Sequence, residues 1–362
     1  MVAVTDADYM ARALFHAARG RGRTSPNPVV GAVVVSADGV VVGQGHHTKA
    51  GEPHAEVYAL DCAGDLARGG TLYCTLEPCS HTGRTGPCVP HIVDAGIRRV
   101  VAAVEDPNPL VRGQGFSDLA ARGVRVDVGI GVHRASMLNQ PFFTTMREGR
   151  PFIIVKAAIS ADGCLAEAPG RRTTLTSASA NRHAHRVRAE VDAIAVGVGT
   201  VLVDDPQLTP RGVYRETALT RVVFDRGLRT PPEARLLSTP AVGPVIIVTT
   251  ADGAARTDVR KDLERRGAEV VVADGTMRSG AAALAERGIT SLLIEGGAGL
   301  HAAAWDEGIV DFVRLYVTPH VIGPSGVRFL AGRRLPPAML AERRVEPIGP
   351  DVLIEGYVHG PH

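Results

Sequence analysis

The chain has 362 residues, which is enough for two domains, and 45% of them are apolar, as in globular proteins with substantial cores. Its formal net charge of +2 is nearly balanced, so we expect no nucleic acid or other polyanion as a partner. No apolar run approaches the roughly 20 residues of a membrane span, and Asp6 and Asp8 interrupt any signal-peptide pattern. Five cysteines leave an odd number once two are assigned to a metal, which favours a reducing cytoplasm over a disulfide framework.

The first half of the chain alternates predicted helices and strands. Amphipathic patterns and helix-start signals predict four helices, over residues 6–19, 54–67, 87–95 and 116–122. Short apolar runs bounded by turn residues predict five strands, over residues 29–35, 40–43, 71–75, 97–104 and 124–128. This alternation predicts an αβα domain over residues 1–148.

One histidine and two cysteines in this domain are candidate metal ligands. His54 opens a predicted helix, Cys79 follows Pro78, and Cys88 comes after an eight-residue insert. One imidazole and two thiolates suit zinc with a fourth position open for water. Zinc lowers the pKa of such a water to roughly 7, and Glu56 could carry its proton to a leaving amine. The motif therefore predicts one zinc per chain and hydrolytic deamination of an amino-substituted ring carbon.

A closed, structural zinc site is the alternative interpretation of this motif. Such a site needs a fourth protein ligand, and Cys74, His81 and His91 are candidates in the sequence. The spacing between Cys79 and Cys88 also departs from the P-C-x-x-C pattern of zinc deaminases.

A second α/β pattern begins after a helical connector at residues 137–149. We expect a strand over 152–158, a basic helix over 177–190 and an apolar strand over 193–199. Further strands are predicted at 221–225, 245–249, 268–272, 291–294 and 312–318, with helices between several of them. The alternation favours a second α/β domain over residues 149–362.

Two glycine-rich strand ends in this domain are candidate cofactor contacts. Residues 294–300 follow a predicted strand and open a helix, so that phosphates could approach backbone N–H groups there, and residues 197–200 form a second glycine-rich strand end. Together they suggest one dinucleotide lying across several strand ends. A tight strand-to-helix turn without a ligand is the alternative for residues 294–300, and residues 197–200 are an equally weak signal when taken alone.

Four charged residues of the second domain are further candidates. Lys156 is one of only three lysines in the chain, and we expect it at the end of its strand. Asp204 would lie near the reactive end of a cofactor, although an Asx turn would also explain it. Arg188 and Arg211 could hold a phosphate with their planar forks, although exposed arginines are common on solvated faces.

Over nearly its whole length the chain resembles the bifunctional riboflavin-biosynthesis deaminase/reductase family. In the first half the resemblance rests on residues 54–57, 75–81, 83–85, Cys88 and 106–109. In the second half it rests on Lys156, Ser160, 162–163, 197–200, 204–206, 208–209, Arg211 and 295–297.

The resemblance implies a cytidine-deaminase-like αβα domain followed by a dihydrofolate-reductase-like α/β domain. The first would deaminate 2,5-diamino-6-(5-phosphoribosylamino)pyrimidin-4(3H)-one. The second would use NADPH to reduce the ribosyl chain of the resulting uracil to ribityl, with hydride accepted at C1 of the opened sugar. The family pattern departs at Thr174, where a tryptophan is usual, and at Arg226, where a serine is usual and where an arginine could contact a cofactor phosphate.

The resemblance also implies residue roles. Those for catalysis would be Glu56, Lys156 and Asp204, and those for the metal would be His54, Cys79 and Cys88. The deaminase substrate would be held by Asn27, His47, His81, Arg84 and Thr85, and the reductase substrate by Lys156, Arg188, Leu208, Arg211 and Glu295. NADPH would contact Ala158, Thr200, Asp204, Gly297, Ala298, Gly299, Leu300 and His301.

Two other functions fit parts of the sequence. The chain could deaminate free or RNA-borne cytosine or adenine while its second domain only binds nucleotide, or it could be a non-catalytic, zinc-stabilised binding protein. The presence of Glu56 argues against the binding protein, and the set of Lys156, Asp204 and Glu295 argues against the simpler deaminase. We expect a cytoplasmic homo-oligomer, a dimer or tetramer, that acts on a small phosphorylated pyrimidine.

Overall fold

The computed structural model describes residues 4–83, 85–239, 242–333 and 335–360. The chain divides into two compact units, an N-terminal unit that ends at Glu148 and a C-terminal unit that begins at Gly149. Within the described residues, the helices are too short or too polar for any of them to cross a membrane.

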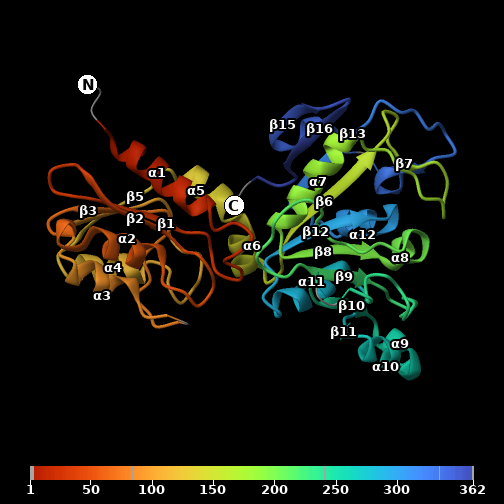
Figure 1. The fold of residues 1–362 in the computed structure, drawn as a ribbon, viewed down its shortest axis with the longest axis horizontal. Helices are drawn as coiled ribbons and strands as arrows, with labels where there is room; N and C mark the ends of the chain where they lie inside the picture. Colours follow the sequence, from red (N-terminus) through yellow and green to blue (C-terminus); the bar gives the residue numbers. More distant parts are fainter. Residues whose placement is uncertain (1–3, 84, 240–241, 334, 361–362) are drawn as a thin grey trace. The chain divides into compact units, whose positions relative to one another are not determined.

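The N-terminal unit is a five-stranded sheet between two layers of helices (Figure 1). Its strands are β1 (Gly31–Val35), β2 (Val41–His46), β3 (Thr71–Cys74), β4 (Arg99–Ala102) and β5 (Arg125–Val128), in the order β2-β1-β3-β4-β5. Strand β1 is antiparallel to both neighbours, whereas β3, β4 and β5 are parallel. The helices are α1 (Asp6–Ala18), α2 (Ala55–Ala63), α3 (Cys88–Asp94), α4 (Gln114–Ala121), α5 (Val132–Leu138) and α6 (Gln140–Glu148), with a 3-10 turn η1 (Gly64–Ala67).

The apolar residues of the strands point to both faces of this sheet and form two cores. Helices α1 and α5 cover one face, and α2, α3 and α4 cover the other. Two glycines of β2 let α2 approach closely, because a Cβ on Gly43 would lie 2.0 Å from the carbonyl oxygen of Ala59, and one on Gly45 would lie 2.6 Å from that of Ala55. This contact places the start of α2, where His54 and Glu56 lie, against the sheet.

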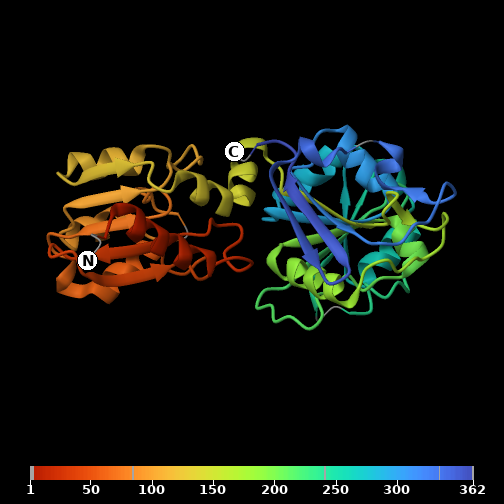
Figure 2. The same cartoon turned by 90° about the horizontal axis from the view of Figure 1, so that it is seen from above.

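The C-terminal unit contains a nine-stranded sheet in the order β11-β10-β9-β8-β12-β6-β13-β16-β15 (Figures 1 and 2). The parallel strands are β6 (Phe152–Ile159), β8 (Ala193–Gly197), β9 (Thr220–Phe224), β10 (Val245–Thr249), β11 (Ala268–Val272), β12 (Ser291–Gly296) and β13 (Phe312–Val317). Two antiparallel strands, β16 (Asp351–Tyr357) and β15 (Ala341–Ile348), extend the sheet beyond β13. Strands β7 (Cys164–Ala166) and β14 (Val327–Arg328) pair separately.

Helices cover both faces of this sheet. Residues of α7 (Ala178–Glu190), α8 (Val198–Asp204) and α10 (Thr257–Arg265) belong to one core, and those of α11 (Met277–Ala285) and α12 (Ala298–Asp306) to the other. The shorter elements are α9 (Ala251–Ala254) and the 3-10 turns η3 (Phe329–Gly332) and η4 (Pro337–Met339). Strands β15 and β16 and helix α5 are elements that the sequence pattern did not predict.

The position of Lys156 differs from the prediction. The sequence pattern placed it at the end of its strand, but β6 continues to Ile159 because its pairing with β13 runs from Ile154 to Ile159. The pairing of β6 with β12, in contrast, ends at Val155 and Ile294. Lys156 therefore lies just beyond the point at which β12 leaves β6.

Candidate functional site

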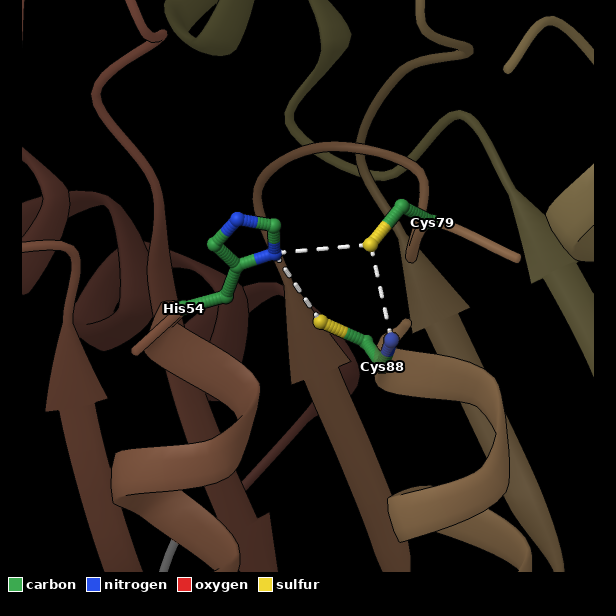
Figure 3. A group of neighbouring side chains, drawn as sticks. All are labelled: His54, Cys79 and Cys88. Atoms are coloured by element: carbon green, nitrogen blue, oxygen red, sulfur yellow. Dashed lines mark hydrogen bonds between the residues drawn. The ribbon is translucent and has the colours of Figure 1, made fainter. Parts of the chain in front are cut away.

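The three predicted metal ligands meet in the N-terminal unit. Nδ1 of His54 lies 3.2 Å from Sγ of Cys88 and 3.4 Å from Sγ of Cys79, and the three donor atoms lie within 4.8 Å of one another (Figure 3). His54 is the N-cap of α2 and Cys88 is the first residue of α3, so two helix N-termini face the group as predicted. Their partial positive charge favours thiolates.

The electrostatics of this group fit a metal cation. Hydrogen bonds with Cys88 and His54 lower the pKa of the Cys79 thiol, and the bond with Cys79 raises the pKa of His54. The Thr85 hydroxyl lies 3.0 Å from Nε2 of His54, which orients the ring so that Nδ1 faces the two sulfurs. One nitrogen and two sulfurs are donors that zinc accepts, with a fourth position left for water.

The structure favours an open site over the closed alternative. Among the described residues, no fourth histidine, cysteine or carboxylate joins the group. Cys74 is buried in β3, where its thiol contacts the carbonyl oxygen of Val101 at 3.8 Å. His81 lines the adjacent cavity instead.

Glu56 lies beside the ligands in the first turn of α2. Only 3% of the residue is exposed, and burial raises the pKa of its carboxyl to about 7. Its Oε2 is buried and has no hydrogen-bond partner among the described residues. A buried carboxyl oxygen without a partner is costly unless a ligand or a water satisfies it, so this atom is available to a reacting molecule.

A cavity of about 290 Å³ lies next to the ligands, with Glu56 in its wall. It is lined by four of the residues predicted to hold the deaminase substrate, namely Asn27, His47, His81 and Thr85. Nδ2 of Asn27 lies 3.1 Å from Nε2 of His47, whose Nδ1 lies 3.1 Å from the carbonyl oxygen of Pro53. The fifth predicted residue, Arg84, lies outside the described residues. The substrate roles stay predictions.

Three further residues of this cavity were not predicted as site residues. Glu77, Asp106 and Asn108 line it together with the four above. The Glu77 carboxylate accepts hydrogen bonds from the backbone N–H groups of Asp106, Gly113, Gly115 and Phe116, at 3.2, 3.0, 2.9 and 3.4 Å. Burial raises the pKa of Glu77 and these four bonds oppose that shift. The side chain thus attaches the loop that carries Asp106 to the metal-binding segment. Its place in the motif at 75–81 was the available signal.

The C-terminal unit contains a cavity of about 830 Å³ at the ends of β8 and β12 and beside β6. It brings together every residue of this unit that was predicted to bind cofactor or substrate, namely Lys156, Ala158, Arg188, Thr200, Asp204, Leu208, Arg211, Glu295, Gly297, Ala298, Gly299, Leu300 and His301. Thr174 also lines this cavity, whereas the exposed Arg226 is not among the described residues of its wall. The expected contact of Arg226 with a cofactor phosphate therefore has no support at this cavity.

A buried group of charges lies in the wall of this cavity. Arg188 binds Glu295 through two hydrogen bonds, of 2.8 and 2.5 Å, and also donates to the carbonyl oxygen of Thr209 at 3.0 Å. The guanidinium of Arg188 therefore binds a carboxylate, whereas the sequence suggested that it would bind a phosphate. Burial raises the pKa of Glu295, but the positive charges of Arg188 and Lys156 outweigh this effect and hold the pKa at about 2. Burial lowers the pKa of Lys156, whose Nζ lies 5.5 Å from the ring centroid of Tyr316.

The two glycine-rich strand ends adjoin in the structure. A Cβ on Gly296 would lie 2.7 Å from Oγ1 of Thr200, and Gly297, with φ of +84°, is the N-cap of α12. Asp204 ends α8, and its buried Oδ1 has no partner among the described residues. The backbone N–H groups at the start of α12 suit the phosphates of a cofactor. The carboxyl oxygen of Asp204 can accept a hydrogen bond from another polar group of the same cofactor.

Comparisons with known proteins assign both units. Residues 3–104 match the cytidine and deoxycytidylate deaminase zinc-binding region, and residues 151–354 match the RibD C-terminal domain. The riboflavin biosynthesis protein RibD of Aquifex aeolicus is 39% identical over 357 residues, covering 98% of this chain and 99% of that protein. RibD of Escherichia coli is 39% identical over 370 residues, covering 96% and 98%.

Solved structures show the same similarity. RibD of Acinetobacter baumannii superposes with a TM-score of 0.86 at 34% identity, covering 97% of this chain and 98% of that one. The diaminohydroxyphosphoribosylaminopyrimidine deaminase/5-amino-6-(5-phosphoribosylamino)uracil reductase of Thermotoga maritima gives 0.83 at 32% identity, with the same coverage. The predicted fold class is confirmed, with a cytidine-deaminase-like domain followed by a reductase domain. The chain therefore belongs to the RibD family of bifunctional riboflavin-biosynthesis enzymes, which join a zinc-binding deaminase domain to a reductase domain.

Proposed function

We propose that the N-terminal unit deaminates 2,5-diamino-6-(5-phosphoribosylamino)pyrimidin-4(3H)-one and that the C-terminal unit reduces 5-amino-6-(5-phosphoribosylamino)uracil with NADPH. The observation that carries the first half is that His54, Cys79 and Cys88 meet beside a cavity lined by Glu56, whose Oε2 has no hydrogen-bond partner among the described residues. The second half is supported by the single cavity that holds the charge group and both glycine turns. The Thermotoga relative carries both activities in its name.

In the deaminase site, His54, Cys79 and Cys88 would hold one zinc per chain, which when bound supplies a water of lowered pKa. Glu56 takes the proton of that water as the oxygen adds to the amino-bearing ring carbon. The same carboxyl then returns that proton to the amine, which leaves as ammonia, and the proton of the added hydroxyl passes to the adjacent ring nitrogen as the carbonyl forms. The low exposure of Glu56 keeps bulk water from competing for this proton.

In the reductase site, residues 297–301 and Thr200 would bind the NADPH phosphates, and the bound cofactor supplies a hydride for C1 of the opened sugar. Lys156 holds a positive charge beside C1 and supplies a proton as the sugar opens. Asp204 orients the nicotinamide end, and Arg188 binds Glu295, whose negative charge favours the protonated form of Lys156. We further propose a homo-oligomer, which a mass measurement in solution would test.

Glu56→Gln tests the deaminase half. The variant should retain about one zinc per chain, because the ligands are untouched, and should lose deamination by roughly 10²–10⁴-fold, the range that general acid–base catalysis supplies. Cys79→Ser is the companion variant. It should lose both zinc and deamination yet still reduce supplied uracil intermediate. Near-normal deamination by Glu56→Gln would overturn the assigned role.

A second experiment tests the order of the reactions. The protein should oxidise NADPH when it receives the uracil intermediate, and should do so with the diaminopyrimidine only while its deaminase is active. In Glu56→Gln, the diaminopyrimidine should therefore fail to drive NADPH oxidation, whereas the uracil should still do so. Deamination of free cytosine or adenine without NADPH oxidation from either pyrimidine would instead favour a simple base deaminase.

A further inference from the structure

The loop over residues 205–219 joins α8 to β9 and carries Leu208 and Arg211 into the wall of the C-terminal cavity. It contains no helix or strand. Two of its residues have left-handed backbone conformations that side chains rarely adopt, Asp205 with φ of +40° and Leu208 with φ of +54°. Contacts from outside the loop must therefore hold it in this shape.

Helix α7 supplies contacts to the middle of this loop. Nδ1 of His185 lies 3.1 Å from the backbone nitrogen of Arg211, which donates a hydrogen bond to it. One helical turn later, Arg188 donates to the carbonyl oxygen of Thr209 at 3.0 Å. The chain on either side of Pro210 is thus attached to two side chains on one face of α7.

The protonation state of His185 follows from its neighbours. Besides the Arg211 N–H, Nη1 of Arg188 lies 3.4 Å from the same Nδ1. A backbone N–H and a guanidinium can only donate, so Nδ1 must be unprotonated to receive them. The charged groups that face the ring are Arg188 on α7, Arg211 in the loop, Lys156 on β6 and Glu295 on β12. Burial and the three cations lower the pKa of His185, while Glu295 opposes the shift.

Arg211 has donors to offer to a ligand. Its side chain is exposed and lines the cavity, and among the described residues its fork makes one weak hydrogen bond, with Gln207 at 3.4 Å. A planar guanidinium on a fixed backbone can bind a phosphate with two parallel hydrogen bonds. If the backbone of Arg211 moved, its guanidinium would no longer be held in the orientation that makes two parallel hydrogen bonds to a phosphate.

We propose that His185 is a positioning residue of the reductase, whose unprotonated Nδ1 anchors the backbone of Arg211 and so aims that guanidinium at the phosphate of the ribosylamino substrate. The inference rests on the proposed reductase function. It assigns His185 no contact with the reacting atoms. Residues 297–301, which would contact NADPH, lie at the start of α12 and not on α7 or its loop. The affinity of the protein for NADPH should therefore not depend on His185.

Three substitutions separate this role from the alternatives. His185→Leu removes the acceptor and fills this buried position with an apolar side chain. His185→Asn restores an acceptor, because its Oδ1 is attached to Cγ as Nδ1 is in histidine. His185→Gln places its oxygen near the position of Nε2 instead. Arg186→Leu, at an exposed position of the same helix, is the matched control.

The measurements are the Kd of 5-amino-6-(5-phosphoribosylamino)uracil for the cofactor-free protein, its KM, the Kd of NADPH, and deamination as a check that the chain folds. His185→Leu should weaken substrate binding by about 10-fold or more, the effect of a lost hydrogen bond that leaves an N–H unpaired. NADPH affinity and deamination should change less than 2-fold. Asparagine should restore most of the substrate affinity, and glutamine should not.

A pH series adds a readout that a purely structural role would not change. Protonated Nδ1 cannot accept the Arg211 N–H, so the wild-type KM should rise as the pH falls through the lowered pKa of His185. The asparagine variant should lack this rise. The substrate phosphate titrates in both proteins, so the difference between them is the diagnostic quantity.

Several outcomes would overturn the inference. Rescue by glutamine but not asparagine would show that Nε2 contacts a ligand directly. Wild-type affinity in His185→Leu would show that the anchor is unnecessary, and an equal loss in Arg186→Leu would indicate a general disturbance of α7. If the wild-type protein failed to oxidise NADPH with the uracil substrate, the proposed function itself would fail, separately from His185.

Discussion

Substituting Glu77 by glutamine should destabilise the N-terminal unit and its deaminase cavity. Each carboxylate oxygen accepts two backbone N–H groups, Oε2 those of Asp106 and Gly113 and Oε1 those of Gly115 and Phe116. Glutamine keeps one oxygen and turns an NH₂ group toward the other pair, so one buried and one partly buried N–H lose their acceptor. At about 1–3 kcal/mol for the buried group and less for the other, the loss is roughly 2–4 kcal/mol.

For a unit of this size that loss corresponds to roughly 4–16 °C in the unfolding midpoint. The two units can be followed separately in the full chain. Zinc release to a chelating dye reports the N-terminal unit, and the fluorescence of Trp305, the only tryptophan of the chain, reports the C-terminal unit. Only the zinc-release midpoint should fall.

The matched control is Glu105→Gln. This side chain is 46% exposed and pairs with Arg112 at 3.1 Å, an exposed ion pair worth about 0–1 kcal/mol. The reasoning would be refuted if both variants released zinc at the same temperature, or if the Trp305 transition moved as far as the zinc release in Glu77→Gln.

Three further predictions address the metal, the reductase and the core. Removing zinc with a chelator should abolish deamination but leave the reduction of supplied uracil intact, and parallel loss of both would contradict separate sites. Lys156→Arg should slow hydride transfer, measured by stopped-flow, by 10-fold or more, which is about 1.4 kcal/mol in the barrier. The affinity for NADPH should stay nearly unchanged, because a guanidinium keeps the positive charge but not the compact donor of lysine. An unchanged rate would make Lys156 a structural residue. Asp311→Asn should lower the free energy of unfolding of the C-terminal unit by about 3–5 kcal/mol, measured by Trp305 fluorescence in urea. The reason is that the side chains of Arg150 and Asp311 are only 3% and 4% exposed and lie 2.6 Å apart. A decrease below 1 kcal/mol would show that this buried pair is dispensable.

The chemistry of the metal site could be predicted from the sequence because short segments encode it. His54 and Glu56 are two residues apart at the start of one helix, and Cys79 and Cys88 flank a loop that leads into another. Ligand type and local helix starts depend on neighbouring residues, which a sequence displays directly. Only part of the reductase cavity was visible in the same way. The two glycine-rich strand ends are local patterns, whereas the roles of most other residues, such as Ala158 and Leu208, came from the family resemblance.

The partners of these residues required the tertiary structure. Glu77 binds N–H groups 29 to 39 positions away, Arg188 binds a carboxylate 107 positions away, and the anchor of Arg211 lies 26 positions earlier. Nothing in the local pattern selects one distant backbone group over another, because that choice depends on which elements pack together.

The edge of the second sheet shows the same division. Strand β15 is exposed or half-buried along its whole length, so it lacks the alternation of apolar and polar residues that marks a strand in sequence. It forms because β16 presents a free edge for its backbone to pair with. The sequence by itself identified the candidate ligands, the proposed acid–base carboxyl and the two-domain pattern, since these depend on local spacing and side-chain chemistry. Only the packing of distant elements decided that β6 carries Lys156 past the end of β12, that Arg188 holds Glu295, and that His185 meets the loop of Arg211.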